Sequence, residues 1–387
     1  MKFLPYVLKN VLRNRVRSTF TVLSITVSLF LVTLLYGYLE FQDELSAASV
    51  QYNRLVVTHR QGITSLVPVS HVDKVRAIEG VKAAAGMSWF GGKYKEERMT
   101  FAQFATDPNC IFSVYDEYQV PPDQLSKWQH DRTGCVVGKR LARNKGWKIG
   151  DKIVLKGDVY AVDLELTVDG VYDGADTADL DMLWFQWAYL DEALKAKRSA
   201  IAGMIGIVSV KAKSADVLAD VAHRIDTRLV GSDAPARAMT EQAFQQMFTE
   251  MIGNVQAFIR NTALAVVFSL VCVAGNAMAM SLRERTREVA VLKAIGFQRT
   301  TILGLVLGEA LAIGLLGGLL GSFGAKALFA TIDMSQIPVP GLNMFYIPWI
   351  TAIHGLLLAG AIGLMSGIFP AWRAATLSVV DGLRRVV

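Results

Sequence analysis

The chain has 387 residues, of which 52% are hydrophobic and 19% charged, and its formal net charge is +6. This composition is too apolar for an ordinary soluble protein and too charged for a chain that lies wholly within a membrane, so a mixed membrane protein is expected. The residues outside 40–260 include 14 basic and 5 acidic side chains. The basic excess therefore belongs to the flanks of membrane segments, and it gives no reason to expect nucleic acid as a partner.

The first 17 residues carry five basic side chains and no acidic one. Their apolar residues fall on one helical face, which predicts a cytoplasmic amphipathic helix along the inner membrane surface. Residues 18–39 follow without a charge and are long enough to cross a bilayer as the first span. Acidic residues after this span, beginning with Glu40, orient it from inside to outside.

Residues 40–260 are expected to lie outside the membrane as a large α+β ectodomain on two helical stalks. The region between the stalks is predicted to have two small lobes, the second over residues 200–239. Helices are predicted at residues 72–78, 138–144 and 216–229. Strands are predicted at residues 54–60, 81–90, 134–138, 151–157, 159–173, 183–190 and 204–212.

Three groups of side chains in this sequence allow two interpretations each. Cys110 and Cys135 either form a disulfide or, as we expect, remain two buried thiols, while Cys272 lies in a span. An aspartate cluster lacks the ligand spacing of a calcium loop, so we interpret it as a solvated turn and not as a metal site. An aromatic cluster fits a strand that buries alternate residues better than an apolar site for a lipid or partner. The aspartates are Asp173, Asp176, Asp179 and Asp181, and the aromatic residues are Trp184, Phe185, Trp187 and Tyr189.

Residues 261–282 are uncharged and predict the second span. Residues 283–300 then carry five basic and two acidic side chains, which predicts a cytoplasmic turn. Within this turn Val289, Leu292 and Ile295 recur at every third position, so they predict an apolar edge on a short helix that Gly296 ends. A helix with such an edge needs a partner surface.

The third span is predicted at residues 301–325 and is rich in glycine. Its small residues have the spacing of closely packed membrane helices at Gly304, Gly308, Gly317 and Gly321. Glu309 is the one acidic residue inside a predicted span, and it is either a proton site or, as we expect, an interhelical hydrogen-bonding group. The remaining segments are an outer loop at 326–345, a fourth span at 346–370 that contains His354, and a cytoplasmic tail at 371–387.

The run MSLRERTREVAVLKAIGFQRTTILGLVLGEALAIGLLGGLLG resembles the core of the FtsX-like permeases of ABC transporters, the type of the macrolide exporter MacB and the lipoprotein-releasing permeases. The turn at residues 13–18 and the tail from Gly367 to Arg384 are also similar to this family, although Ser378 stands where a proline is usual. The resemblance implies a coupling helix that docks on a separate ATPase subunit. Its residues are Arg283, Glu284, Arg285, Arg287, Glu288, Val289, Leu292, Lys293, Ala294, Ile295 and Gly296.

The resemblance also implies the partners of the chain. Two permease copies, alike or different, would join ATPase subunits that bind ATP and Mg²⁺, and a periplasmic adaptor and an outer-membrane channel are further candidate partners beside membrane lipid. The chain itself has no G-x-x-x-x-G-K-[ST], H-E-x-x-H, C-x-x-C or G-x-S-x-G motif. We therefore expect no cofactor and no enzyme activity in this chain.

The function implied by the resemblance is mechanotransmission, in which ATP-driven motion of the ATPase reaches the ectodomain. The work done there would be export of a periplasmic substrate or extraction of a lipoprotein or lipid. The alternative is a non-transporting FtsX-like regulator that activates a cell-wall hydrolase. Both interpretations imply a multi-pass protein of the bacterial inner membrane with its N- and C-termini in the cytoplasm.

Overall fold

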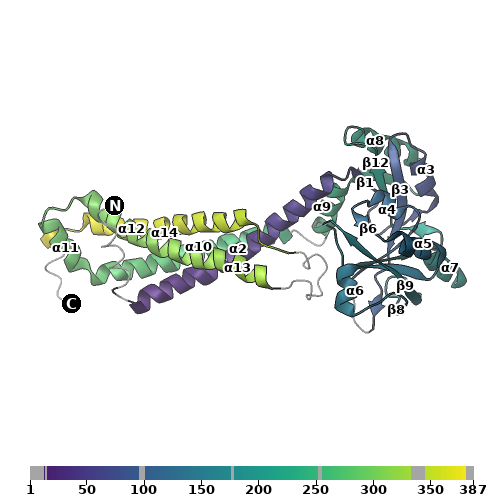
Figure 1. The fold of residues 1–387 in the computed structure, drawn as a ribbon. Helices are drawn as coiled ribbons and strands as arrows, with labels where there is room; N and C mark the ends of the chain where they lie inside the picture. The colour runs from purple at the N-terminus through teal and green to yellow at the C-terminus, as the bar shows by residue number, and fades with distance from the viewer. Residues whose placement is uncertain are drawn as a thin grey trace. The chain divides into compact units, whose positions relative to one another are not determined.

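The structure is a computed structural model that describes residues 13, 15–95, 101–175, 178–251, 255–332 and 345–380. The chain divides into two compact units, whose helices and strands are labelled in Figure 1. The helical unit comprises Met1–Gln42, Asn254–Ile332 and Tyr346–Val387, and the sheet unit comprises Asp43–Gly253 and Asp333–Phe345. Most of the expected N-terminal helix, most of the outer loop and the end of the tail lie outside the described residues.

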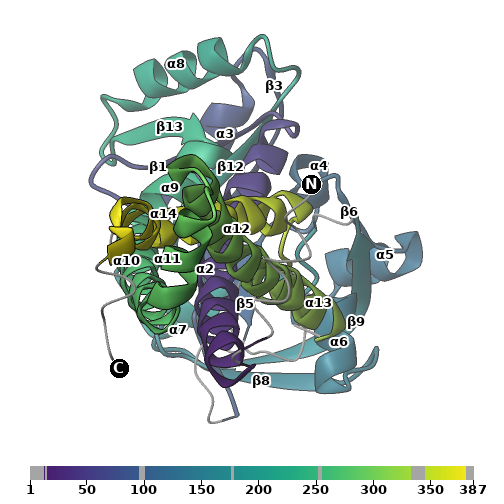
Figure 2. The same ribbon diagram turned by 90° about the vertical axis from the view of Figure 1, so that its left-hand side faces the viewer.

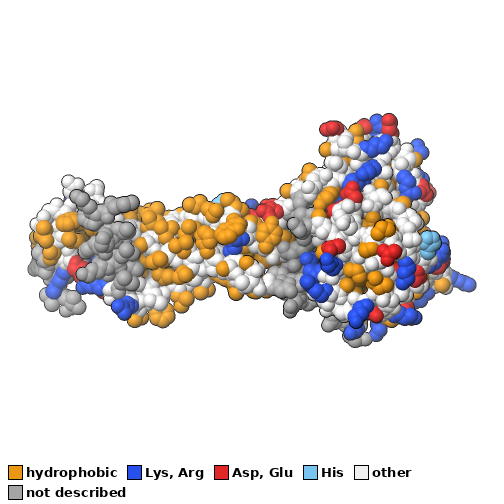
Figure 3. Space-filling model, viewed as in Figure 1, with side chains coloured by type: hydrophobic (Ala, Val, Ile, Leu, Met, Phe, Trp, Pro, Cys, Tyr) orange, Lys and Arg blue, Asp and Glu red, His pale blue; other side chains and the backbone are white. Residues whose placement is uncertain are grey.

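Four helical segments among the described residues are long and apolar enough to cross a membrane. On the face shown in Figure 3, hydrophobic side chains are spread along the helical unit, whereas charged side chains are more frequent on the sheet unit. The expected fold class, four transmembrane helices with an α+β domain between the first and second, is confirmed. The spans lie in α2 (Arg15–Val50), in α10 (Val255–Glu284), in the continuous run of α12 (Arg299–Gly318), π-helix η1 (Leu319–Phe323) and α13 (Gly324–Thr331), and in α14 (Trp349–Thr376).

Glycines let the third span approach its neighbours closely. A Cβ atom on Gly317 would lie 2.4 Å from Ile25 Cγ2 of α2, and a Cβ atom on Gly321 would lie 2.6 Å from the carbonyl oxygen of Thr26. A Cβ atom on Gly304 would instead point into open space, so Gly304 makes no close helix contact within the described chain. The core of the unit draws on all four spans, which Figure 2 shows nearly end-on. Its buried residues are Ile25, Leu29, Leu270, Met278, Ala310, Ile313, Ala359 and Ile362.

The sheet unit is built on one mixed sheet. In the described residues this sheet has 11 strands in the order β13-β1-β12-β3-β5-β10-β7-β9-β8-β4, and β6 pairs with β9. A separate pair joins β2 (Val67–Pro68) to β11 (Met204–Ile205). The strands of the main sheet are β1 (Arg54–His59), β3 (Val81–Trp89), β4 (Lys93–Tyr94), β5 (Ala102–Thr106), β6 (Tyr118–Gln119), β7 (Gly134–Gly138), β8 (Lys152–Lys156), β9 (Leu164–Gly174), β10 (Met182–Gln186), β12 (Ile207–Ala212) and β13 (Ala236–Thr240).

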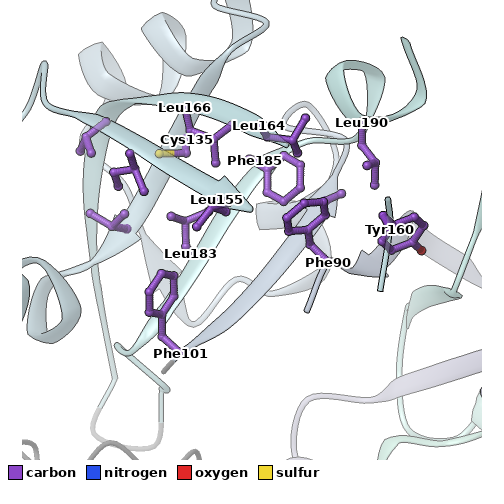
Figure 4. Packing of buried hydrophobic residues seen from close by; sticks show 14 of the residues in the cluster. Phe90, Phe101, Cys135, Leu155, Tyr160, Leu164, Leu166, Leu183, Phe185 and Leu190 are labelled. Carbon is purple, nitrogen blue, oxygen red and sulfur yellow. The ribbon is translucent and has the colours of Figure 1, made fainter. Parts of the chain in front are cut away.

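Both faces of the central strands are buried. Successive residues of a strand point to opposite faces, and Trp184 and Phe185 of β10 accordingly enter two different hydrophobic cores. Figure 4 shows the core of Phe185, where its ring packs edge-to-face against Phe90. The helices of the unit are α3 (Ser70–Arg76), α4 (Ile111–Val114), α5 (Pro122–His130), α6 (Lys139–Lys145), α7 (Trp187–Ala196), α8 (Leu218–Leu229) and α9 (Glu241–Met251).

Residues 183–190 do not form a single strand. β10 ends at Gln186, and α7 begins at Trp187. The prediction was wrong from Trp187 onward because Leu190 and Leu194 are buried with the four-residue spacing of a helix face. The aromatic residues nevertheless pack in the cores or against them, so the core interpretation of the aromatic cluster agrees with the structure.

Residues 200–239 do not form a lobe of their own. They supply β12, α8 and β13, but β12 lies between β1 and β3, and β13 pairs with β1. Buried Val221 and Ile225 of α8 pack in the same core as Leu55 and Val57 of β1. This end of the sheet is therefore completed by strands from the beginning of the ectodomain, a long-range pairing that periodicity does not reveal.

Cys110 and Cys135 are free thiols in the structure. Cys135 is buried in the core of Phe185, whereas Cys110 packs against the core of Trp184 on the opposite face of the sheet. A disulfide between them would need the backbone to move. Burial raises the pKa of both thiols, so neither has the character of a reactive thiolate.

Candidate coupling site

The candidate site is the short helix α11 (Thr286–Ala294), which lies between α10 and α12 in the chain. One non-helical residue, Arg285, separates α10 from α11. Gly296 has a φ of 101°, the left-handed conformation that favours glycine after a helix. The amide of Phe297 donates to the carbonyl oxygen of Leu292 at 3.1 Å, which completes the cap. The helix therefore ends at the glycine, as the sequence predicts.

The inner face of α11 packs against other helices of this chain. Val289 is buried in a cluster with Ile302 of α12 and Ala374 of α14. Leu292 is half-buried and lines a cavity of about 30 Å³ between α11 and the neighbouring spans. Two of the three residues of the predicted apolar edge thus contact this chain itself, with Val289 buried and Leu292 half-buried.

The outer face of α11 carries a different row of residues. The side chain of Ile295 is 72% exposed and that of Val291 is 45% exposed, and Arg287 and Ala294 are exposed beside them. Arg287, Val291 and Ile295 are four residues apart, so they lie on one side of the helix. The sequence prediction rests on apolar residues three positions apart, which mark the inner face. The outer row has an equally regular spacing of four positions in the sequence.

Polar contacts tie α11 and its preceding turn to α12 and α14. Arg285 Nη1 donates to Glu309 Oε2 of α12 at 2.9 Å, and Arg285 Nε donates to Glu288 Oε2 at 3.3 Å. Lys293 Nζ donates to the carbonyl oxygen of Ala375 at 2.7 Å, at the end of α14. The interhelical hydrogen-bonding interpretation of Glu309 agrees with its contact to Arg285.

Ion pairs tie the same region to the beginning of α2. Arg17 pairs with Glu284, and Arg13 pairs with Glu288. The Arg13 side chain is exposed, and an exposed ion pair contributes at most about 1 kcal/mol. The Arg285–Glu309 pair is more enclosed, since its side chains are 20% and 9% exposed. Helix α11 and the turn before it therefore have polar contacts with α12 and α14, and Glu288 of α11 pairs with Arg13 just before α2.

Two further sequence candidates have partners in the structure. His354, which has no acidic neighbour in sequence, lies with Nδ1 at 3.2 Å from Glu40 Oε1 at the end of the first span. In the aspartate cluster, Lys139 Nζ donates to Asp173 at 2.6 Å, and Arg140 pairs with Asp179 and Asp181. No group of three metal-binding side chains occurs among the described residues, and Asp176 lies outside them.

Comparison with known proteins places this site in a family. The profile of the MacB-like periplasmic core domain matches residues 18–228, more than half of the chain, and that of the FtsX-like permease C-terminal part matches residues 262–379. The chain belongs to the MacB-type, FtsX-like permease family. Helix α11, the third and fourth spans and most of α10 lie in the FtsX-like part.

Relatives of this MacB-type permease support the same assignment. An uncharacterized ABC transporter permease of Methanocaldococcus jannaschii is 24% identical over 98% of this chain and 97% of its own length. The macrolide export ATP-binding/permease protein MacB of Burkholderia pseudomallei is 28% identical over 40% of this chain and 25% of its own length. From its family matches and these two relatives, the protein is an ABC transporter permease of the MacB/FtsX type. The chain is also similar to the solved periplasmic region of MacB from Actinobacillus actinomycetemcomitans, a match that covers 52% of this chain and 95% of that one, with 10% identity and a TM-score of 0.38.

Proposed function

We propose that this permease transmits ATP-driven motion from a separate ATPase subunit to its ectodomain. The observation that carries the proposal is the two-sided construction of α11. Its outer row is exposed, while its inner face and the turn before it contact α12 and α14, and Glu288 pairs with Arg13 just before α2. A displacement of α11 by a partner would therefore act on the ends of several spans together.

The outer row of α11 suits a protein partner with an apolar groove bordered by acidic residues. Val291 and Ile295 provide exposed apolar area, and Arg287 adds a positive charge to the same side. An exposed aliphatic row on a short helix is the type of surface that docks in a groove. In this proposal the groove belongs to the ATPase, which binds ATP and Mg²⁺, and a second permease copy completes the complex.

The work done by the ectodomain would be export of a periplasmic substrate or extraction of a lipoprotein or lipid. Motion passed along helices fits this unit better than a pore, because glycines bring its spans into close contact and Glu309 is already bonded to Arg285. A periplasmic adaptor and an outer-membrane channel would be further partners in the export case.

Substitution of the outer row tests the docking surface. Val291→Asp combined with Ile295→Asp should weaken co-purification of the ATPase with the affinity-tagged permease about tenfold or more, because a desolvated carboxylate without a partner costs more than the 1.4 kcal/mol that corresponds to tenfold. Val230→Asp, at a residue of similar exposure in the sheet unit, is the matched control and should leave the complex intact. Unchanged recovery of the ATPase with the double variant would contradict the proposal.

The proposed orientation in the inner membrane, with both termini in the cytoplasm, has its own test. Single cysteines replacing exposed Gln61 and Asp158 should react with an impermeant thiol reagent added to whole cells after opening of the outer membrane. A cysteine replacing Arg287 should react only after the inner membrane is opened, because the basic turn stays inside. Labelling of Arg287→Cys before that step would contradict the orientation.

A further inference from the structure

The ends of the two stalk helices that join the sheet, the end of α2 and the start of α9, meet at one buried arginine. We call these two ends the stalk roots. Arg54 is the first residue of β1 and follows α2 by only three residues, and Glu241 is the first residue of α9. Arg54 Nε donates to Glu241 Oε2 at 2.7 Å. One guanidinium thus links the end of the helix that contains the first span to the start of the helix that leads toward the second.

A third segment reaches the same guanidinium. Arg54 Nη1 donates to both carboxylate oxygens of Glu117, at 2.6 and 2.7 Å, from the turn before β6. The rings of Tyr52 and Tyr115 each lie 4.4 Å from the guanidinium carbon. The side chains of Arg54 and Glu117 are only 5% and 6% exposed. These contacts satisfy the charge in a desolvated place, where an ion pair needs good geometry to be tolerated.

The segment Tyr115–Glu117 is fastened to the sheet at each of its three residues. Tyr115 Oη lies 3.0 Å from Ser209 Oγ of β12, Asp116 pairs with Lys211 of the same strand, and Glu117 pairs with Arg54. The two acidic residues of this segment neutralise two neighbouring cations. Arg54 and Lys211 are direct cross-strand partners, and two cations side by side on a sheet repel each other unless acidic residues neutralise them.

We propose that Arg54 is a positioning residue that holds both stalk roots to the Tyr115–Glu117 segment, so that a movement of the stalks is passed to the β6–β9 side of the sheet. The segment continues directly into β6, which pairs with β9. Without the guanidinium, Glu241 of α9 would lose its bond to β1, and Glu117 beside β6 would lose its tie to the stalk roots. This inference rests on the proposed function, because it names the residue through which transmitted motion enters the ectodomain.

The rigidity of this junction can be measured in the full-length permease reconstituted in lipid nanodiscs. Spin labels at exposed Gln119 and Gln246, in a background without Cys110 and Cys272, report the distance across the junction. A single narrow distance is expected for the parent chain. Arg54→Met should broaden this distribution about twofold or more, because two carboxylates lose their shared partner. An unchanged distribution in Arg54→Met would overturn the proposal.

Matched variants separate positioning from general stability. Arg140→Met is the control, because Arg140 also pairs with two carboxylates, Asp179 and Asp181, but lies away from the stalks in sequence and in its contacts. Its cross-junction distance should stay narrow. Glu241→Ala is the second test variant if Arg54→Met fails to fold, since it keeps the Arg54–Glu117 pair and removes only the α9 contact. Broadening in Arg140→Met and none in Glu241→Ala would also overturn the proposal.

Transmission itself is read from two fluorophores, one on exposed Ala47 of the α2 stalk and one on Gln119, each paired with a quencher on lipid headgroups. ATP and vanadate are added to the complex with its ATPase. In the parent chain both signals should change. In Arg54→Met the Ala47 signal should persist, and the Gln119 change should fall about twofold or more. No change at Ala47 in the parent chain would overturn the proposed function and this inference together, whereas equal changes at Gln119 in both chains would overturn this inference alone.

Discussion

Arg285 in the helical unit and Arg54 in the sheet unit each hold two carboxylates, but in different surroundings. Arg285 bonds to Glu309 and Glu288, its side chain is 20% exposed, and a small cavity lies beside it. Arg54 is 5% exposed, and two tyrosine rings enclose it. The same charge arrangement is therefore partly accessible to water at the Arg285 site and closed to water at the Arg54 site.

This difference matches the roles that we propose for the two sites. Contacts that water can replace cost little to exchange, whereas a desolvated charge strongly resists separation from its partners. The Arg285 site has room to rearrange when α11 is displaced. The Arg54 site should keep its geometry while the stalks move. The following predictions test this contrast, from the largest expected effect to the smallest.

Removal of the buried arginine should have the largest effect on stability. Arg54→Ala leaves Glu117 and Glu241 desolvated without a cation, which should cost about 3–5 kcal/mol of the free energy of unfolding. The melting temperature of the sheet unit, followed by tryptophan fluorescence of the full-length chain in detergent, should fall by roughly 2–4 °C for each kcal/mol. Arg285→Ala should lower the stability of the chain less. An equal or larger loss in Arg285→Ala would contradict the contrast between the two sites.

A milder change at the open site should leave the permease working. Glu309→Gln retains an oxygen that accepts from Arg285 Nη1, so we expect assembly with the ATPase and ATP-driven activity within about threefold of the parent. Glu309→Leu removes this acceptor and should reduce both by about tenfold, as a lost hydrogen bond to a charged group costs about 1.5–3 kcal/mol. The measurement is ATPase activity of the reconstituted complex. Loss of activity in Glu309→Gln would favour a proton site instead.

The sequence predicts the parts of this molecule that depend on local patterns. Uncharged runs locate the four spans, and the strand predicted at residues 134–138 corresponds to β7. The inner and outer faces of α11 were not separated, because Val289 and Val291 are equally apolar and only the neighbouring spans decide which one is buried. A helix with apolar residues on two sides has no single apolar face from which the sequence could predict the buried one.

The ion pairs lie beyond sequence reasoning for a different reason. Glu309 was singled out as an acid inside a span, but its partner Arg285 follows from how the turn before α11 folds over α12. Arg54, Glu117 and Glu241 are far apart in the chain, and each is unremarkable in its own segment. Their importance arises only when strand pairing and the two stalk roots bring them to one place, which depends on tertiary structure.

His71 sharpens the contrast, because it is a buried titratable group with no acidic partner among the residues that the structure describes. Its Nε2 lies 3.1 Å from the carbonyl oxygen of Ala234, and burial lowers its pKa, with Lys74 and His59 adding positive charge nearby. Because the folded-state pKa of His71 is lowered, neutral His71 contributes its full share of stability above the ordinary pKa of 6.5. This contribution is lost as pH falls through the folded-state pKa. The melting temperature of the sheet unit should therefore fall on acidification from neutral pH. In His71→Gln this pH-dependent part should disappear, and an unchanged pH dependence would assign it to other groups.

The smallest effect is expected at Asp169, a buried carboxylate that pairs with one basic residue, Lys127, in the described part of the chain. Lys127 Nζ lies 2.8 Å from its Oδ1, but the lysine side chain is half exposed, and burial raises the pKa of Asp169 despite this contact. Because the folded-state pKa of Asp169 is raised, protonated Asp169 contributes its full share of stability below the ordinary pKa of 3.8. This contribution is lost as pH rises through the folded-state pKa. Asp169→Asn should therefore leave the melting temperature at neutral pH unchanged or raise it by about 1–3 °C, because a neutral amide avoids the desolvated charge.

The opposite sign is expected at Asp173, which provides the control on the neighbouring part of β9. The contact from Lys139 Nζ and the bond from the Gly174 amide lower the pKa of Asp173, so its charged form is the favoured one. Asp173→Asn should lower stability slightly at neutral pH, by less than about 1 kcal/mol because the pair is exposed. The Asp169 difference should shrink as pH falls toward 4, where the raised pKa lets this carboxylate take up a proton. The Asp173 difference should persist at pH 4 and shrink only as pH falls below 3.8, because the pKa of Asp173 is lowered. If Asp169→Asn instead destabilised the chain as Arg54→Ala does, a single half-exposed lysine would hold a buried carboxylate as firmly as the enclosed guanidinium holds its two, and the contrast between open and closed charge sites would fail.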